Sequence, residues 1–274
     1  MSGGFLQQVC AEAVQRVDAD RSGEDDADLR RRALRTPPPP SFADALAGEG
    51  MAVITEVKRA SPSRGHMTDI PDAAALASAY VRGGAAAISV LTEPAHFEGA
   101  LGDLIAVAAA VEVPVLRKDF VIDDYQVWQA RAAGAAAVLL IVAALEDTAL
   151  TDLMAAADQA GLDTLVETHS AGEIARAVAA HAACRFAGPP RRLVLGVNAR
   201  DLVTLEVDRD HIARVRRDAD LPQGALLVAE SGIRGPADVV AYAAVGADAV
   251  LVGEHVATAP DPEVAVSALL AGAP

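Results

Sequence analysis

The sequence predicts an α/β protein of the (β/α)8 TIM-barrel class with an N-terminal helical extension. The main observation is a recurring unit of an alanine-rich helical stretch, a glycine and a short apolar run. Three copies are nearly superimposable: GGAAAISVL from Gly83, AGAAAVLLI from Ala133 and VGADAVLVG from Val245. Such apolar runs are typical of strands buried on both faces of a parallel sheet. A length of 274 residues also suits one barrel. We therefore expect residues 1–274 to form a single domain.

Eight apolar runs are the expected strands, and helical patterns separate them. They span residues 52–56, 87–91, 114–118, 137–141, 163–167, 193–198, 226–230 and 249–253. The helix over 170–180 opens with a predicted capping box from Ser170 to Glu173, and the helix over 123–134 has two acids in its first turn. A doubly wound open sheet is the alternative, but no GxGxxG follows the first strand.

Residues 1–50 form the extension, which ends in a Pro-rich spacer. Apolar side chains at helical spacing predict a helix near the start: Phe5, Leu6, Val9, Ala13, Val14 and Val17. A charged stretch follows, and four prolines at 37–40 form a stiff spacer. The helix either plugs the bottom of the barrel or covers its mouth, and periodicity leaves both positions open.

Composition bounds the partners of the chain. A net charge of −15 argues against nucleic acid and acidic membranes, which need a basic surface, but not against a small anionic substrate. Without a signal peptide or a membrane-length apolar run, we expect a cytoplasmic protein. No apolar helix face stands out, which favours a monomer. The two cysteines and six histidines lack metal-ligand spacing, so we predict no metal site.

Polar residues where the predicted strands end are candidates for an active site, because barrel enzymes place their sites at the C-terminal ends of the strands. Lys58 and Lys118 are the only lysines in the chain, and both occupy such positions. Arginine cannot release its proton near neutral pH, whereas lysine can be tuned to do so. The pattern therefore predicts proton transfer by these lysines, with Glu167 as the base.

Glycine turns follow the last two predicted strands, in ESGIRG (230–235) and LVGEH (251–255). Loops at these positions of a barrel often bind phosphate through backbone N–H groups and a helix N-terminus. Ser61, in the segment ASPSRG after the first strand, adds a hydroxyl group. We expect a phosphate site here.

These motifs resemble the indole-3-glycerol phosphate synthase family. The matching stretches, in the family's order from about residue 51 to 257, are EVKRASPSRG, ISVLTE, PVLRKDF, AVLLI, LVETH, GVNARDL, ESGI and LVGE. The resemblance implies cyclisation of 1-(2-carboxyphenylamino)-1-deoxyribulose 5-phosphate to indole-3-glycerol phosphate, with loss of carbon dioxide and water. It implies a carbon–carbon lyase of tryptophan biosynthesis that uses no cofactor or metal.

The resemblance also implies roles for individual residues. Lys118 resembles the general acid of ring closure, Glu167 the base of the dehydration, and Lys58 the residue that holds the substrate carboxylate and protonates the departing hydroxyl. The other implied site residues are Glu56, Asn198, Ser231 and Arg200 at polar positions, Ser61, Gly232 and Gly253 at the phosphate, and Phe97, Phe120, Leu139 and Ile141 around the anthranilate ring.

Two positions depart from the family pattern: His255 stands where a phosphate-binding serine is usual, and Ala199 where a second asparagine is common. Two other functions are possible. A catalytically silent barrel could bind a sugar phosphate, although arginine would serve binding alone. Phosphoribosylanthranilate isomerase uses a cysteine and an aspartate, but neither Cys10 nor Cys184 ends a predicted strand.

Overall fold

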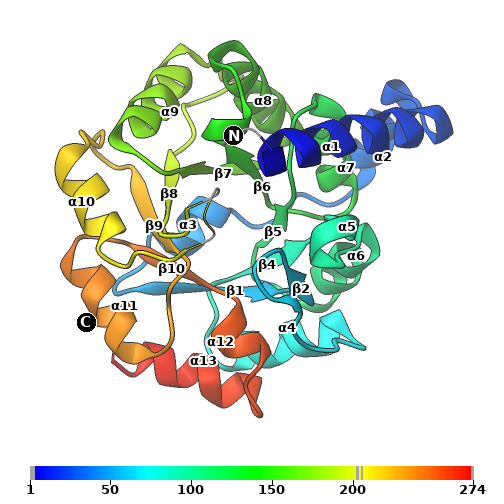
Figure 1. Cartoon of the computed structure of the whole chain (residues 1–274). Coiled ribbons are helices and arrows are strands. Elements are labelled where there is room, and N and C mark those ends of the chain that lie inside the picture. Colours follow the sequence, from blue (N-terminus) through cyan, green and yellow to red (C-terminus); the bar gives the residue numbers. More distant parts are fainter. Residues whose placement is uncertain (1–3, 202–203, 205, 273–274) are drawn as a thin grey trace.

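The computed structural model describes residues 4–201, 204 and 206–272, and its centre is a closed barrel of eight parallel strands (Figure 1). The strands are β1 (Ala52–Val57), β4 (Ala87–Leu91), β5 (Val115–Lys118), β6 (Ala137–Ile141), β7 (Asp163–Thr168), β8 (Val194–Asn198), β9 (Leu226–Glu230) and β10 (Ala249–Val252). Each coincides with one of the eight predicted runs to within a residue at either end. The predicted fold class is confirmed.

Helices surround the barrel and connect its strands (Figure 1). The longer ones are α4 (Ala73–Arg82), α6 (Leu101–Ala110), α7 (Asp124–Ala132), α8 (Asp147–Ala160), α9 (Ala171–Ala183), α10 (His211–Asp218), α11 (Pro236–Ala244) and α13 (Pro262–Leu270). Short elements lie in the loops: β2 (Ala60–Ser61), β3 (Gly65–His66), α5 (Pro94–Phe97), the 3-10 helix η1 (Val142–Ala144) and α12 (Glu254–Ala257). No helix in the described ranges is long and apolar enough to cross a membrane.

The N-terminal extension contributes to both ends of the barrel. It comprises α1 (Gly4–Gly23), α2 (Asp26–Arg35) and α3 (Phe42–Leu46). The backbone N–H groups of Phe42 and Ala43 bind the carboxylate of Asp163, the first residue of β7, so α3 closes the bottom. Arg16 of α1 instead binds Asp119, which follows β5 at the mouth. The predicted helix is thus α1, which lies at the mouth, and the bottom is closed by α3, which was not predicted.

One detail of the predicted caps is wrong. Ser170 accepts a hydrogen bond from the backbone of Glu173, but the Glu173 carboxylate accepts from the backbone of His169, one residue before the expected donor. The reciprocal capping box occurs on α7, between Asp123 and Gln126. The difference brings the Glu173 carboxylate beside the His169 ring, which bears on the active site below.

Candidate active site

Alternation along the strands builds the site. Ile54, Leu116, Leu139 and Leu165 belong to the apolar cluster that fills the barrel, whereas their neighbours in sequence pack against the outer helices. Side chains two residues further along the same strands face the same way. At the C-terminal ends of β1, β5, β7, β8 and β9, the last inward-facing residue is polar. These residues are Glu56, Lys118, Glu167, Asn198 and Glu230. An apolar core therefore ends in a polar layer at the mouth.

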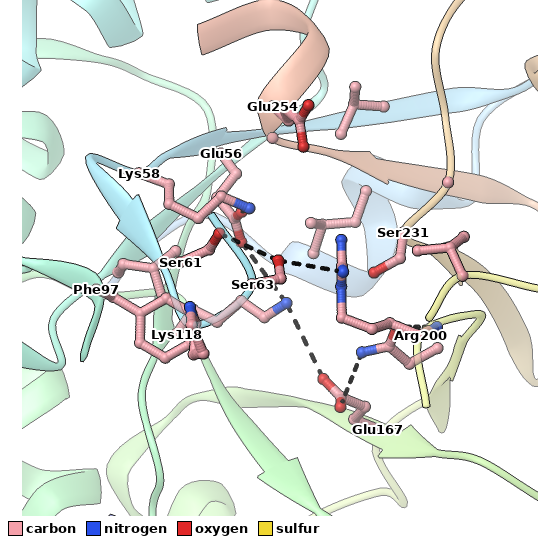
Figure 2. Close-up of a pocket in the computed structure, with 18 of the residues that line it drawn as sticks. Glu56, Lys58, Ser61, Ser63, Phe97, Lys118, Glu167, Arg200, Ser231 and Glu254 are labelled. Atoms are coloured by element: carbon pink, nitrogen blue, oxygen red, sulfur yellow. Dashed lines mark hydrogen bonds and ion pairs between the residues drawn. The ribbon is translucent and has the colours of Figure 1, made fainter. Parts of the chain in front are cut away.

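A cavity of about 870 Å³ opens above this layer (Figure 2). All fourteen site residues named from the sequence line it: Glu56, Lys58, Ser61, Phe97, Lys118, Phe120, Leu139, Ile141, Glu167, Asn198, Arg200, Ser231, Gly232 and Gly253. They come from the C-terminal ends of β1, β5, β6, β7 and β8 and from the segments that follow the barrel strands. The structure thus brings the predicted residues to one place, and their chemical roles stay predictions.

Lys118 is the centre of the polar layer. Its ammonium group lies 3.1 Å from Glu230, 3.6 Å from Glu56 and 4.0 Å from Glu167. Lys58 lies at the edge of the same group, 2.6 Å from Glu56. Three buried carboxylates therefore face two ammonium groups, and the cluster carries one excess negative charge when all five are ionised.

This crowding shifts the acidity of the members in different directions. Burial opposes ionisation of Lys118, but the carboxylates of Glu230, Glu56 and Glu167 outweigh it and raise the pKa of the lysine. Burial also opposes ionisation of Glu56, yet Lys58 and Lys118 together lower the pKa of that carboxyl. For Glu230, burial and the neighbouring carboxylates outweigh Lys118 and raise the pKa to about 7. At neutral pH, Lys118 is therefore protonated and can donate, and its pKa shift is opposite to the downward tuning that was expected for lysine from the sequence.

Glu167 is held from three sides. Asn198 donates to its Oε1 at 3.1 Å, His169 Nε2 lies 3.6 Å from the same oxygen, and Lys118 faces Oε2. Only 4% of the Glu167 side chain is exposed. A carboxylate kept out of bulk water and oriented by fixed donors is well suited to accept a proton from a substrate.

Two glycines leave room for the charged layer. A Cβ on Gly253 would lie 2.4 Å from a carboxylate oxygen of Glu56 and 2.9 Å from the Lys58 ammonium. A Cβ on Gly196, in β8, would lie 2.0 Å from a carboxylate oxygen of Glu230. Any side chain at either position would displace a charged group. Gly253 was expected at the phosphate, and the structure adds this second reason for a glycine.

The segment EVKRASPSRG crosses one side of the mouth. Its β2–β3 hairpin is anchored by Arg59, which binds the carboxylate of Asp103 on α6. At the hairpin, Arg200 donates to the Ser63 hydroxyl at 3.3 Å (Figure 2). Arg64 lies 2.8 Å from Glu254. The dense polar cluster that follows the first strand therefore serves as one wall of the cavity.

The wall next to the hairpin is cationic. Ser231 and Gly232 both adopt left-handed backbone conformations after β9, with φ angles of 70° and 81°. Arg209, Arg234 and His255 line the cavity near this turn, together with Arg200. A left-handed turn with guanidinium groups around it suits a phosphate. Arg209 and Arg234 were not predicted, because arginines in loops are common and nothing in their spacing marks them.

An aromatic group forms the apolar wall. The rings of Phe97 and Phe120 lie 6.3 Å apart, and Phe5 of α1 lies 6.4 Å from Phe120. Phe5 and Leu6 line the cavity, although helical periodicity does not indicate which surface their helix covers. Because this apolar wall faces the charged layer, the cavity suits a ligand that has an aromatic group at one end and an anionic group at the other.

One group in the described part of the chain has the residue types of a metal site: Glu12, Glu93 and His96, between α1 and α5. Glu93 already accepts hydrogen bonds from the backbone N–H groups of Ala95, His96 and Phe97. Glu12 and His96 bind each other at 2.9 Å. These contacts explain the three side chains as a helix cap and an attachment of α1.

The closed barrel and the lysine–carboxylate layer at its mouth define an enzyme of the acid–base type. The family model for indole-3-glycerol phosphate synthase matches residues 6–269, which includes most of the N-terminal extension. The indole-3-glycerol phosphate synthase of Mycobacteroides abscessus is 50% identical over 98% of this chain and 94% of its own length. Indole-3-glycerol phosphate synthase 1 of Streptomyces coelicolor is 51% identical over 95% and 90%. The chain belongs to the indole-3-glycerol phosphate synthase family, whose members are lyases.

Solved structures support the fold. A 3-hexulose-6-phosphate synthase matches with a TM-score of 0.63 at 19% identity, over 81% of this chain and 99% of its own. Thiamine phosphate pyrophosphorylase from Pyrococcus furiosus matches with a TM-score of 0.58 at 15% identity, over 84% and 96%. At these identities the likeness concerns the barrel alone.

Proposed function

We propose that the chain cyclises 1-(2-carboxyphenylamino)-1-deoxyribulose 5-phosphate to indole-3-glycerol phosphate at this cavity, by general acid–base catalysis. The observation that carries the proposal is the position of the Lys118 ammonium. It lies within 4.0 Å of three buried carboxylates, between an aromatic wall and a cationic wall. The anthranilate ring would pack on Phe97, Phe120, Leu139 and Ile141, and the phosphate would lie at Gly232, Gly253, Ser61 and Arg200.

The roles are those that the family resemblance implies, and the positions of the groups are compatible with them. In ring closure, the ring carbon that bears the carboxylate attacks the substrate carbonyl carbon, and Lys118 donates a proton to the carbonyl oxygen. The carboxylate, held by Lys58, then leaves as carbon dioxide and its bonding electrons restore the aromatic ring. In the dehydration, Lys58 protonates the departing hydroxyl while Glu167 removes a proton from the adjacent carbon. Glu56, Asn198 and Ser231 orient these groups.

Two alternatives fit the site less well. A silent sugar-phosphate-binding barrel has no need of two lysines among buried carboxylates, because such groups cost free energy to desolvate. An isomerase with a catalytic cysteine has no candidate thiol: Cys10 lies on α1 and Cys184 ends α9, and neither lines the cavity.

The partner is a small anionic phosphorylated substrate. Four properties remain predictions from the sequence. They are a monomeric state, a cytoplasmic location, a single domain over residues 1–274, and the absence of metal, cofactor and nucleic acid. Gel filtration coupled to light scattering tests the first, and one calorimetric transition would support the single domain.

Turnover is the test of the proposal. Purified protein mixed with the carboxyphenylamino-deoxyribulose phosphate should produce indole fluorescence and one carbon dioxide per product. The matched control is Glu112→Gln, an exposed carboxylate away from the cavity, which should leave the rate unchanged. Substrate binding without fluorescence or carbon dioxide release would contradict the lyase and favour the silent barrel.

A further inference from the structure

His169 has both ring nitrogens directed at carboxylates. Its Nε2 lies 3.6 Å from Oε1 of Glu167, and its Nδ1 lies 3.5 Å from Oε2 of Glu173, on the first turn of α9. Both nitrogens are shielded from solvent, and neither reaches a partner within hydrogen-bond distance among the described residues. The imidazole therefore stands between the proposed base and a second carboxylate, slightly beyond hydrogen-bond length from each.

The charge state of the ring follows from this position. A neutral imidazole has one N–H, so one of the two carboxylates would face a lone pair. An imidazolium presents an N–H to both. The other titratable groups near the ring are Glu230, on β9, which adds a third negative charge, and His211 of α10, whose ring binds the His169 carbonyl oxygen. All the carboxylates around His169 favour its protonated form.

We propose that His169 is a positioning residue for the base, and that its imidazolium bridges Glu173 and Glu167 and keeps the Glu167 carboxylate oriented. The inference rests on the proposed function of Glu167. Glu167 then lies between two cations, with His169 and Asn198 at Oε1 and Lys118 at Oε2. The fixed backbone supports the bridge, since Glu173 also accepts from the His169 N–H at 2.7 Å.

The acidity of the ring agrees with the geometry. Burial opposes protonation of His169, but Glu173 and Glu167 outweigh it and raise the pKa of the imidazole. The bridge is therefore present below this raised pKa and is lost as pH rises through it. Activity that depends on the bridge should show a partial step at that pH, on the alkaline side.

The first test is the pH profile of kcat/KM for His169→Gln. We expect about a tenfold loss at neutral pH and no alkaline step, because the imidazolium no longer holds the base in its productive orientation. Glu173→Gln should retain the imidazole but move the alkaline step to lower pH. His181→Gln, at the other end of α9, is the matched control and should keep the wild-type profile. A parallel loss at every pH in His169→Gln would show a purely structural role and overturn the proposal.

The second test does not depend on turnover. Imidazole NMR titration of the wild-type protein, assigned with His169→Gln, should give His169 a pKa above that of a model peptide, and Glu173→Gln should lower it. If His169 titrates below the peptide value in wild type, the bridge is absent and the proposal fails. If wild type shows no turnover but His169 titrates high, the bridge stands and the proposed function is what fails.

Discussion

Buried carboxylates have different hydrogen-bond partners at the two ends of the barrel. At the bottom, Asp163 accepts hydrogen bonds from the backbone of Phe42 and Ala43 at 2.9 and 3.0 Å, and from Arg191 at 2.9 Å. Both of its oxygens have partners. At the mouth, three carboxylates share Lys118, and Oε1 of Glu230 has no hydrogen-bond partner among the described residues. A satisfied buried charge contributes to stability, whereas a crowded one is prepared for proton transfer.

The largest effect should come from removing the base at the mouth. Glu167→Gln retains the shape of the side chain but cannot accept a proton, so kcat/KM should fall by about 10³-fold. The free energy of unfolding should stay within about 1 kcal/mol of wild type, because the change also relieves repulsion among the carboxylates. Steady-state fluorescence assays and urea unfolding measure the two quantities. A large loss of stability with near-normal turnover would contradict this prediction, because Glu167 would then serve stability rather than catalysis.

Next in size is the corresponding change at the bottom. Asp163→Asn replaces charge-assisted hydrogen bonds to α3 and Arg191 with weaker ones, so the free energy of unfolding should fall by about 2–3 kcal/mol. The kcat/KM at 25 °C should remain within about twofold of wild type. Asp44→Asn, exposed on the same α3, is the matched control. If Asp163→Asn lost activity without losing stability, the bottom would not be purely structural.

A smaller effect is a pH dependence of stability, which should arise from Glu230 at the mouth of the barrel. The pKa of Glu230 is raised from 4.5 to about 7 in the folded protein, so the native state binds the extra proton between these values. The contribution of this group to stability is complete below pH 4.5 and is lost as pH rises through 7. Glu230→Gln should remove this pH dependence. Unfolding free energies at about pH 5 and pH 7.5 test it, with Glu112→Gln as control. An unchanged pH slope would mean that Glu230 ionises normally.

The smallest effect concerns the cationic wall. His255 lines the cavity near Gly253, at the position where the family pattern has a phosphate-binding serine. Replacing the imidazole by a hydroxyl in His255→Ser should lower the KM by about threefold, because a hydroxyl can donate a hydrogen bond to the phosphate. Steady-state assays of both proteins at one pH measure the difference. Identical KM values would show that position 255 does not contact the phosphate.

Much of the fold could be predicted because the barrel repeats its pattern. The three repeated runs are short, follow a glycine turn and are buried, so GGAAAISVL, AGAAAVLLI and VGADAVLVG marked their strands directly. The placement of α1 and α3 could not be predicted. An apolar helix face shows that the helix packs against other residues, but it does not show at which end of the barrel the helix lies.

The site residues that could be predicted are those marked by their residue type or by their position at the end of a strand. Lys58, Lys118 and Glu167 stood out by residue type at strand ends, and the family resemblance supplied their roles. Glu230 was not among the predicted site residues, although the inward alternation of Leu226, Val228 and Glu230 could have placed it in the charged layer. His169 and Arg209 reach the site from loops, where no periodicity fixes the direction of a side chain.

The most direct test of the central claim, that the mouth of the barrel performs proton transfer through Lys118, is the kcat/KM of Lys118→Arg. Arginine preserves the positive charge among Glu230, Glu56 and Glu167 but cannot give up its proton near neutral pH. We predict a fall of about 10³-fold, with substrate affinity and unfolding free energy close to wild type. Activity equal to wild type would contradict the account, because positive charge alone would then suffice.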